Sequence, residues 1–184
     1  MGLNLANKTS ITRIILIPFF IAYIVYSRLD VALIIFVLAI ISDGVDGFIA
    51  RTFKQKTELG TILDPIADKL LLLSAYICLS MVKSIPPDLR LPPYVPIIII
   101  SRDAIIVLGS VVILLVKGDV KIAPSAIGKI TTFFQMITIV SILVRFKGSF
   151  VLWNLAVLLT VISGIDYIIK GSRTLNENHS VEEG

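Results

Sequence analysis

Six long apolar stretches, separated by short polar breaks, organise the chain. Their approximate bounds are 9–27, 31–50, 61–83, 94–116, 122–145 and 149–170. Each stretch is close to the roughly 20 mostly apolar residues that an α-helix needs to cross a bilayer. The pattern therefore predicts an all-α integral membrane protein with six transmembrane helices.

The breaks between the stretches carry residues typical of turns. A polar segment runs from Ser27 to Asp30, and four prolines mark a longer connection within 84–93. Short glycine turns are expected at 117–119 and 147–149. We expect residues 1–172 to form one transmembrane domain and residues 173–184, which are rich in Asn and Glu, to form a flexible polar tail.

Composition agrees with this prediction. Of the 184 residues 56% are hydrophobic, and the mean hydropathy is +0.94, which is more apolar than an ordinary soluble domain. The net charge of +4 suits a surface that faces anionic lipid. No basic run is interleaved with aromatic residues, so no nucleic-acid partner is expected. The only cysteine and the only histidine, Cys78 and His179, make neither an internal disulfide nor a Cys/His metal site.

Basic residues near the ends of the stretches predict an orientation. Six spans place both termini on one side, where the flanking basic residues are Lys8, Arg51, Lys54, Lys56, Lys117, Lys121, Lys170 and Arg173. Fewer lie on the opposite side, namely Arg28, Lys83, Arg90, Arg145 and Lys147. Because positive charge favours the cytoplasmic side, both termini and the loop at 51–60 are expected to face the cytoplasm.

Four carboxylates interrupt the second and third stretches: Asp43, Asp46, Asp64 and Asp68. A charge in hydrocarbon costs about 3 kcal/mol or more on insertion scales. Spacings of three and four put each pair on one face of its helix, and the short connection predicts antiparallel neighbours with both pairs near their cytoplasmic ends. Four converging carboxylates need compensating charge, which two divalent cations supply. Oxygen ligands favour Mg²⁺ or Mn²⁺.

Two structural alternatives stand beside the metal site. The carboxylates could form salt bridges with Arg51 and Lys69, helped by loop lysines, although two cations do not balance four anions. Small residues near the acids, such as Gly44 and Gly47, could serve close helix packing. They could equally open the backbone to an anionic ligand, which the neighbouring acids favour.

The acidic residues belong to a longer motif. Written out, it is D-x2-D-G-x2-A-R-x8-G-x3-D-x3-D, and its fixed positions are Asp43, Asp46, Gly47, Ala50, Arg51, Gly60, Asp64 and Asp68. With every spacing met, the chain resembles the CDP-alcohol phosphotransferase (phosphatidyltransferase) family. The resemblance in size and six-span layout covers roughly residues 3–172.

The resemblance implies a function for each of these positions. Asp43, Asp46 and Asp64 would be the main metal ligands, and Asp68 would complete the site and act as general base. The CDP part of CDP-diacylglycerol would lie in a pocket lined by Gly47, Ala50, Arg51 and Gly60. An alcohol acceptor would attack the lipid-side phosphorus, and CMP would leave. The resemblance also implies a homodimer among membrane lipids.

Further matches concern the acceptor. The N-terminal segment and the fifth stretch resemble those of bacterial phosphatidylglycerophosphate synthases at Asn7, Thr9, Arg13 and Pro18 and at Gly128, Lys129, Thr131 and Gln135. This resemblance implies a bacterial inner membrane and glycerol-3-phosphate as acceptor. The alternative is the eukaryotic-type cardiolipin synthase, with phosphatidylglycerol as acceptor, because Arg102-Asp103 stands where the first group usually has R-E and Ser110 replaces its second Arg. Arg13, Arg102 and Lys129 are the candidate acceptor-binding residues.

Each candidate has another interpretation. Arg102 could pair with Asp103 or extend to the interface, and Arg13 and Lys129 could contact lipid headgroups. Asp166 is expected at the interface. For the whole chain, the alternatives are an ion-coupled transporter that uses the intramembrane carboxylates and a noncatalytic lipid-binding scaffold. Many transporters are built from two inverted halves, which would place a second acidic cluster in the fourth to sixth stretches. The sequence has no such cluster there.

Overall fold

The structure, a computed structural model, describes residues 5–52, 58–83, 85–117 and 125–176. Six helices account for most of them: α1 (Leu5–Val25), α2 (Leu29–Thr52), α3 (Glu58–Met81), α4 (Tyr94–Lys117), α5 (Ala126–Leu143) and α6 (Ser149–Asn176). Each predicted apolar stretch corresponds to one helix, so the all-α prediction is confirmed.

Apolar helices make this a membrane protein. In the described part, α4, α5 and α6 carry stretches long enough to cross a bilayer, at Tyr94–Ile113, Ala126–Leu143 and Ser149–Arg173. Shorter apolar stretches lie in α1 and α2, at Ile11–Val25 and Leu29–Ser42. Large apolar side chains point outward, and Leu115 is 80% exposed. Lipid contact explains such outward apolar surface, which a soluble monomer rarely carries over a large area.

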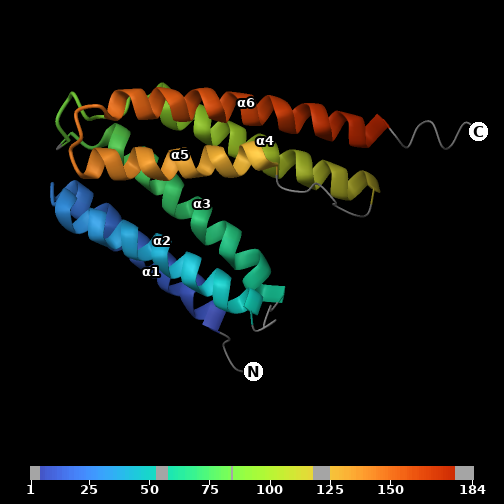
Figure 1. Cartoon of the computed structure of the whole chain (residues 1–184), viewed down its shortest axis with the longest axis horizontal. Helices are drawn as coiled ribbons and strands as arrows, with labels where there is room; N and C mark the ends of the chain where they lie inside the picture. The colour runs from blue at the N-terminus through green and yellow to red at the C-terminus, as the bar shows by residue number, and fades with distance from the viewer. Residues whose placement is uncertain (1–4, 53–57, 84, 118–124, 177–184) are drawn as a thin grey trace, which may run out of the picture.

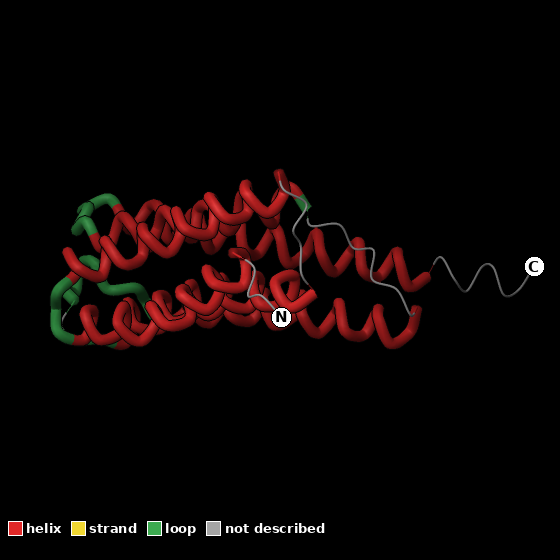
Figure 2. The backbone as a smooth tube through the Cα atoms, turned by 90° about the horizontal axis from the view of Figure 1, so that it is seen from below, coloured by secondary structure: helices red, strands yellow, loops and turns green. Residues whose placement is uncertain are grey.

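The helices form two groups of three (Figure 1). In one group α6 packs against both α4 and α5, and in the other α1 packs against both α2 and α3. The groups are joined because α3 also packs against α4 and α5, and α2 packs against α5. Helices α4, α5 and α6 run along the long axis, and α1, α2 and α3 are inclined to it (Figure 1). The described loops gather mainly at one end (Figure 2). The chain therefore runs up and down, with successive helices reversed.

Two of the tight turns at the loop end share one helix-ending geometry. Ser27 and Arg145 have φ angles of 62° and 58°, in the left-handed region. Beyond each, a backbone N–H reaches back to a helix carbonyl: Arg28 N to Tyr23 O at 2.8 Å and Phe146 N to Ser141 O at 2.9 Å. This arrangement satisfies carbonyl groups that the end of a helix leaves without partners. It reverses the chain within a few residues, so α1 and α5 are followed closely by antiparallel neighbours.

Two buried hydrogen bonds connect the helices α3, α5 and α6. The Gln135 side chain of α5 is fully buried, and its Nε2 donates to Thr160 Oγ1 of α6 at 3.1 Å. The buried Tyr76 hydroxyl of α3 donates to the Gln135 main-chain oxygen at 3.0 Å. Apolar residues such as Phe20, Phe36 and Leu79 surround this region as the main core. Polar groups in such a setting are stable when paired, so these bonds fix α3, α5 and α6 relative to one another.

Candidate active site

The four motif aspartates lie on two helices that are consecutive in the chain. Residues 53–57 alone separate the end of α2 from the start of α3. At 1.5 Å per residue, Asp43 and Asp46 lie about 14 and 9 Å before the end of α2. On the same scale, Asp64 and Asp68 lie about 9 and 15 Å after the start of α3. The two pairs therefore stand at matching distances from the connection, as a shared site requires.

The side chains of residues 43–66 lie outside the described part of the structure. This segment includes three of the aspartates and the predicted donor-pocket residues Gly47, Ala50, Arg51 and Gly60. Side chains that are described form no group of three or more metal-binding residues. In the described part of the chain, α1 packs against both α2 and α3, and α2 does not pack directly against α3. The convergence of the four carboxylates stays a prediction.

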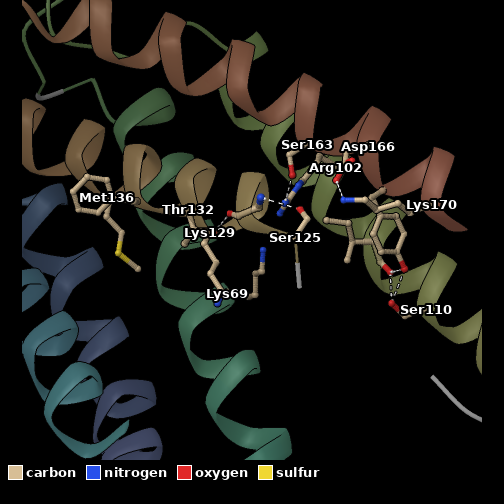
Figure 3. A pocket seen from close by; sticks show the side chains of 14 residues that line it. Lys69, Arg102, Ser110, Ser125, Lys129, Thr132, Met136, Ser163, Asp166 and Lys170 are labelled. Atoms are coloured by element: carbon tan, nitrogen blue, oxygen red, sulfur yellow. Dashed lines mark hydrogen bonds and ion pairs between the residues drawn. The ribbon is translucent and has the colours of Figure 1, made fainter. Parts of the chain in front are cut away.

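A cavity of about 560 Å³ opens between α3, α4, α5 and α6 (Figure 3). Four basic side chains line it, one from each helix: Lys69, Arg102, Lys129 and Lys170. Lys69 directly follows Asp68 on α3, but consecutive helical residues point about 100° apart, and Asp68 is not among the residues that line the cavity. Basic residues from four helices on one cavity make it suited to an anion.

Arg102 lies deepest among these basic residues and is 8% exposed. Its Nη1 donates to Asp103 Oδ1 at 2.7 Å. Its Nη2 donates to Ser163 Oγ of α6 at 2.6 Å (Figure 3). Within the described residues, its buried Nε has no hydrogen-bond partner. The local pair with Asp103 that the sequence allowed is therefore present, and Arg102 lines the cavity as well.

Asp103 contacts two of the basic residues at once. Its Oδ2 lies 2.5 Å from Lys69 Nζ, while its Oδ1 accepts from Arg102. Lys69 was one of two basic residues that might have balanced the aspartates of α2 and α3. Its ion pair among the described residues runs to Asp103 of α4, and the salt-bridge alternative for the acidic cluster stays open.

The start of α5 forms one wall of the cavity. Ser125 is the N-cap, and its Oγ accepts from Gly128 N at 3.0 Å. A Cβ added at Gly128 would lie 3.2 Å from Arg102 Nη2, so the guanidinium rests against this first turn. The exposed Lys129 follows on the cavity side. Because a helix N-terminus carries partial positive charge, it adds to the anion-attracting character of the basic side chains.

Hydroxyl groups and one further ion pair occupy the α4–α6 side of the cavity. Ser110 Oγ and Tyr167 Oη are 2.7 Å apart, and both can donate to the Ile106 carbonyl, at 2.8 and 2.9 Å. Lys170 Nζ lies 2.7 Å from Asp166 Oδ2, one helical turn earlier on α6. The position of the absent second Arg is thus filled by a neutral, hydrogen-bonded serine.

Two of the three predicted acceptor-binding residues lie together here. Arg102 and Lys129 line the cavity, whereas Arg13 is buried on α1 and is not among the lining residues. Sequence reasoning missed Lys69, Ser163 and Lys170 as cavity residues. The i,i+4 spacing of Asp166 and Lys170 was visible in the sequence, but only the packing of α6 on α4 and α5 brings that pair to the cavity.

Comparison with known proteins agrees with the motif. Residues 3–162 match the model of the family described as CDP-alcohol phosphatidyltransferase. A Bacillus subtilis (strain 168) protein named CDP-diacylglycerol--glycerol-3-phosphate 3-phosphatidyltransferase is 34% identical over 200 positions, covering 96% of this chain and 99% of that protein. A Mycobacterium tuberculosis (strain ATCC 25618 / H37Rv) protein named probable phosphatidylglycerophosphate synthase is also 34% identical, covering 94% of this chain and 83% of its own length. An Aquifex aeolicus protein with the same name as the Bacillus protein is 29% identical.

Proposed function

Because the chain belongs to the CDP-alcohol phosphatidyltransferase family, we propose that it transfers the phosphatidyl group of CDP-diacylglycerol to glycerol-3-phosphate. The match over residues 3–162 confirms the family, and the protein is an enzyme of that class. Several of its relatives carry glycerol-3-phosphate in their names, and this supports the choice of acceptor.

The basic cavity, which reaches α3 at Lys69, is the observation on which the acceptor assignment rests. Lys69 lines the cavity and is the next residue after Asp68. An acceptor whose phosphate lies among Arg102, Lys129 and Lys170 would therefore have its hydroxyl end within reach of α3. Holding the acceptor in this way turns an encounter of two substrates into a reaction between positioned groups.

Charge favours a phosphate monoester over a phosphodiester. The basic side chains Lys69, Arg102, Lys129 and Lys170 outnumber the carboxylates of Asp103 and Asp166 by two. A phosphate monoester carries about −1.5 to −2 at neutral pH, whereas the phosphodiester of phosphatidylglycerol carries a single negative charge. Glycerol-3-phosphate therefore matches the cavity more closely than the cardiolipin synthase acceptor does.

The donor site is proposed at the motif on α2 and α3. The donor set of Asp43, Asp46, Asp64 and Asp68 consists of oxygens alone, which fits Mg²⁺ or Mn²⁺, and the matching distances of both pairs from the α2–α3 connection support a shared site. Two such ions, when bound, would neutralise the carboxylates and polarise the diphosphate oxygens. Arg51 would donate to the diphosphate, and Gly47, Ala50 and Gly60 would leave room for the nucleotide.

The proposed chemistry is one displacement at phosphorus. Asp68 takes the proton of the acceptor hydroxyl, whose oxygen forms a bond to the phosphorus on the lipid side. The bond from that phosphorus to the bridging oxygen breaks, and CMP leaves with the electron pair. A positioned base of this kind contributes about 10²–10⁴-fold to the rate. The remaining acceleration comes from orientation and from electrostatic stabilisation of the phosphoryl oxygens.

We place this reaction at the cytoplasmic face of a bacterial inner membrane, with six membrane-crossing helices. The excess of basic residues at the terminal side supports this orientation, and a nucleotide-linked donor would be available there. A homodimer, which the family resemblance implied, stays part of the proposal.

An acceptor panel tests the function. Purified full-length protein in detergent receives CDP-diacylglycerol, Mg²⁺ or Mn²⁺, and one acceptor: glycerol-3-phosphate, phosphatidylglycerol, inositol phosphate or serine. We expect CMP release with glycerol-3-phosphate and at least tenfold less with the others. Release with phosphatidylglycerol instead would establish the cardiolipin synthase alternative, and no release with any acceptor would favour a transporter or scaffold.

A further inference from the structure

We infer that Asp103 is a positioning residue for the acceptor: it holds Lys69 and Arg102 in place so that their free N–H groups face the cavity. The inference rests on the proposed function, because it assigns this role toward the acceptor phosphate. Its geometric basis is one carboxylate with both oxygens engaged, Oδ1 with Arg102 Nη1 at 2.7 Å and Oδ2 with Lys69 Nζ at 2.5 Å.

Asp103 pairs with two of the basic residues that line the cavity but is not itself one of the lining residues. Lys69 and Arg102 line the cavity, whereas Asp103 is absent from its lining. A carboxylate that lined the cavity would repel a phosphate, but one outside the lining that pairs with the two cations orients them and leaves their remaining donors for a ligand. Asp103 therefore acts through its neighbours without touching the acceptor.

Burial makes the bridge necessary. The Arg102 side chain is 9% exposed and that of Asp103 21% exposed. The cations of Arg102 and the 40% exposed Lys69 repel each other, and a buried charge such as that of Arg102 is strongly unfavourable without a partner. Ser163, the other partner of Arg102, is neutral. Among the described residues, Asp103 is the shared counter-charge that lets both cations face one ligand.

The bridge also links the acceptor cavity to the catalytic helix. Lys69 follows Asp68 on α3, and Asp103 lies on α4. The contact between them is the ion pair that joins α3 to α4 in the described part of the chain. By fixing the side of α3 that faces α4, it sets the position of the acceptor phosphate relative to the proposed base.

A purely structural role would give a different kinetic result. Loss of packing alone would lower the thermal midpoint and the amount of active protein, leaving the KM values of the surviving enzyme unchanged. Loss of positioning raises KM for the phosphorylated acceptor and leaves KM for CDP-diacylglycerol unchanged, since the donor site lies on α2 and α3.

The test compares full-length variants in detergent. Asp103→Asn removes the charge and keeps the size, and Asp103→Glu keeps a carboxylate that can still reach both partners. Asp30→Asn is the matched control, because it makes the same chemical change at an exposed pair with Arg28 near the α1–α2 turn. KM and kcat are measured separately for glycerol-3-phosphate and for CDP-diacylglycerol, together with the thermal midpoint.

We expect Asp103→Asn to raise KM for glycerol-3-phosphate at least tenfold and to change KM for CDP-diacylglycerol less than twofold. Asp103→Glu should stay within threefold of wild type, and Asp30→Asn should match wild type. An unchanged acceptor KM in Asp103→Asn, or an Asp103→Glu enzyme as impaired as Asp103→Asn, would overturn the inference.

Two further measurements keep the test decisive. If Asp103→Asn does not fold, Lys69→Met breaks the same ion pair from its 40% exposed partner, and a wild-type acceptor KM in that variant would also overturn the inference. Wild-type turnover with glycerol-3-phosphate is measured first. Its absence contradicts the proposed function, whereas wild-type turnover with unchanged KM in the variants contradicts only the role of Asp103.

Discussion

The Arg102 side chain, which lines the cavity, has close neighbours on α4, α5 and α6. Its guanidinium is held by Asp103 and Ser163, and the first turn of α5 approaches it so closely that a Cβ at Gly128 would lie 3.2 Å from Nη2. The buried Arg102 is thus clamped between α5 and α6. Small changes in side-chain size on these two helices should therefore alter acceptor binding before they alter other properties of the enzyme.

We therefore predict that Gly128→Ala raises KM for glycerol-3-phosphate. The new methyl group would displace the guanidinium by a few tenths of an ångström and weaken its charged hydrogen bonds, at a cost of about 0.5–1.5 kcal/mol, or roughly two- to tenfold in KM. Gly164→Ala is the control, because its Cβ would meet Arg102 Cγ at an ordinary 3.5 Å. Steady-state kinetics that show equal KM values for the two variants would contradict the close fit.

A second residue-scale prediction concerns Asp68. Asp68→Asn removes the proposed proton acceptor and retains the size and one oxygen of the side chain. We expect kcat to fall about 10²–10⁴-fold while CDP-diacylglycerol still binds. Turnover is measured as CMP release, and donor binding by titration with the purified variant. Normal turnover in Asp68→Asn would remove its role as base.

The site residues that could be predicted from the sequence are those whose partners lie close to them along the chain. The aspartate motif was readable because its spacing is fixed within 43–68, and the Arg102–Asp103 pair was readable because the two are adjacent. Ser163 and Lys170 were not, since they reach the cavity only when α6 packs against α4 and α5. The sequence showed that Ser110 stands where a second Arg is usual. Its contact with Tyr167 could be seen only in the structure, because it joins α4 to α6.

At the level of helices, α4 and α6 meet through a glycine. A Cβ at Gly109 would lie 2.9 Å from Tyr167 Cε1, closer than real Cβ contacts. The ring therefore occupies the space that the missing side chain leaves, and it brings its hydroxyl to Ser110 and Ile106. Small residues that permit close approach of this kind are common between membrane helices.

Gly109→Ala should accordingly destabilise the protein. Overpacking of a tight contact costs about 1–3 kcal/mol, and we expect a lower midpoint of thermal unfolding in detergent. Gly171→Ala, in the same pair of helices, is the matched control because its Cβ would lie 3.7 Å from Ile113 Cδ1. A Gly109→Ala midpoint equal to that of Gly171→Ala would show that Tyr167 moves away without cost.

The helices were predictable because apolar stretches and polar breaks mark them directly. The expected glycine turn at 147–149 is present between α5 and α6, but the residue in the left-handed conformation is Arg145. Glycine is the residue that usually adopts this conformation. From the sequence alone, Gly148 was the residue expected to adopt it. In the structure Gly148 instead leaves room for the Phe146 ring, because a Cβ placed there would lie 2.5 Å from Phe146 Cε1.

In the whole molecule, two groups of three helices bring together residues far apart in the sequence. The α1–α3 group carries the aspartate motif, and α4, α5 and α6 supply most of the basic cavity, with Lys69 and Asp103 joining the two. Hydropathy predicted the number of helices but not their grouping, because every helix is apolar on several faces. The cavity consequently had no signature in the sequence beyond scattered basic residues.

The count of metal ions bound per chain tests the central claim most directly. Equilibrium Mn²⁺ binding to purified full-length protein, read by electron paramagnetic resonance, should give two ions for wild type and for Arg102→Ala, which changes a residue outside the aspartate motif. In Asp43→Ala combined with Asp64→Ala, both tight ions should be lost, together with CMP release. A wild-type chain that binds no Mn²⁺, or a double variant that binds as many ions as wild type, would contradict the account.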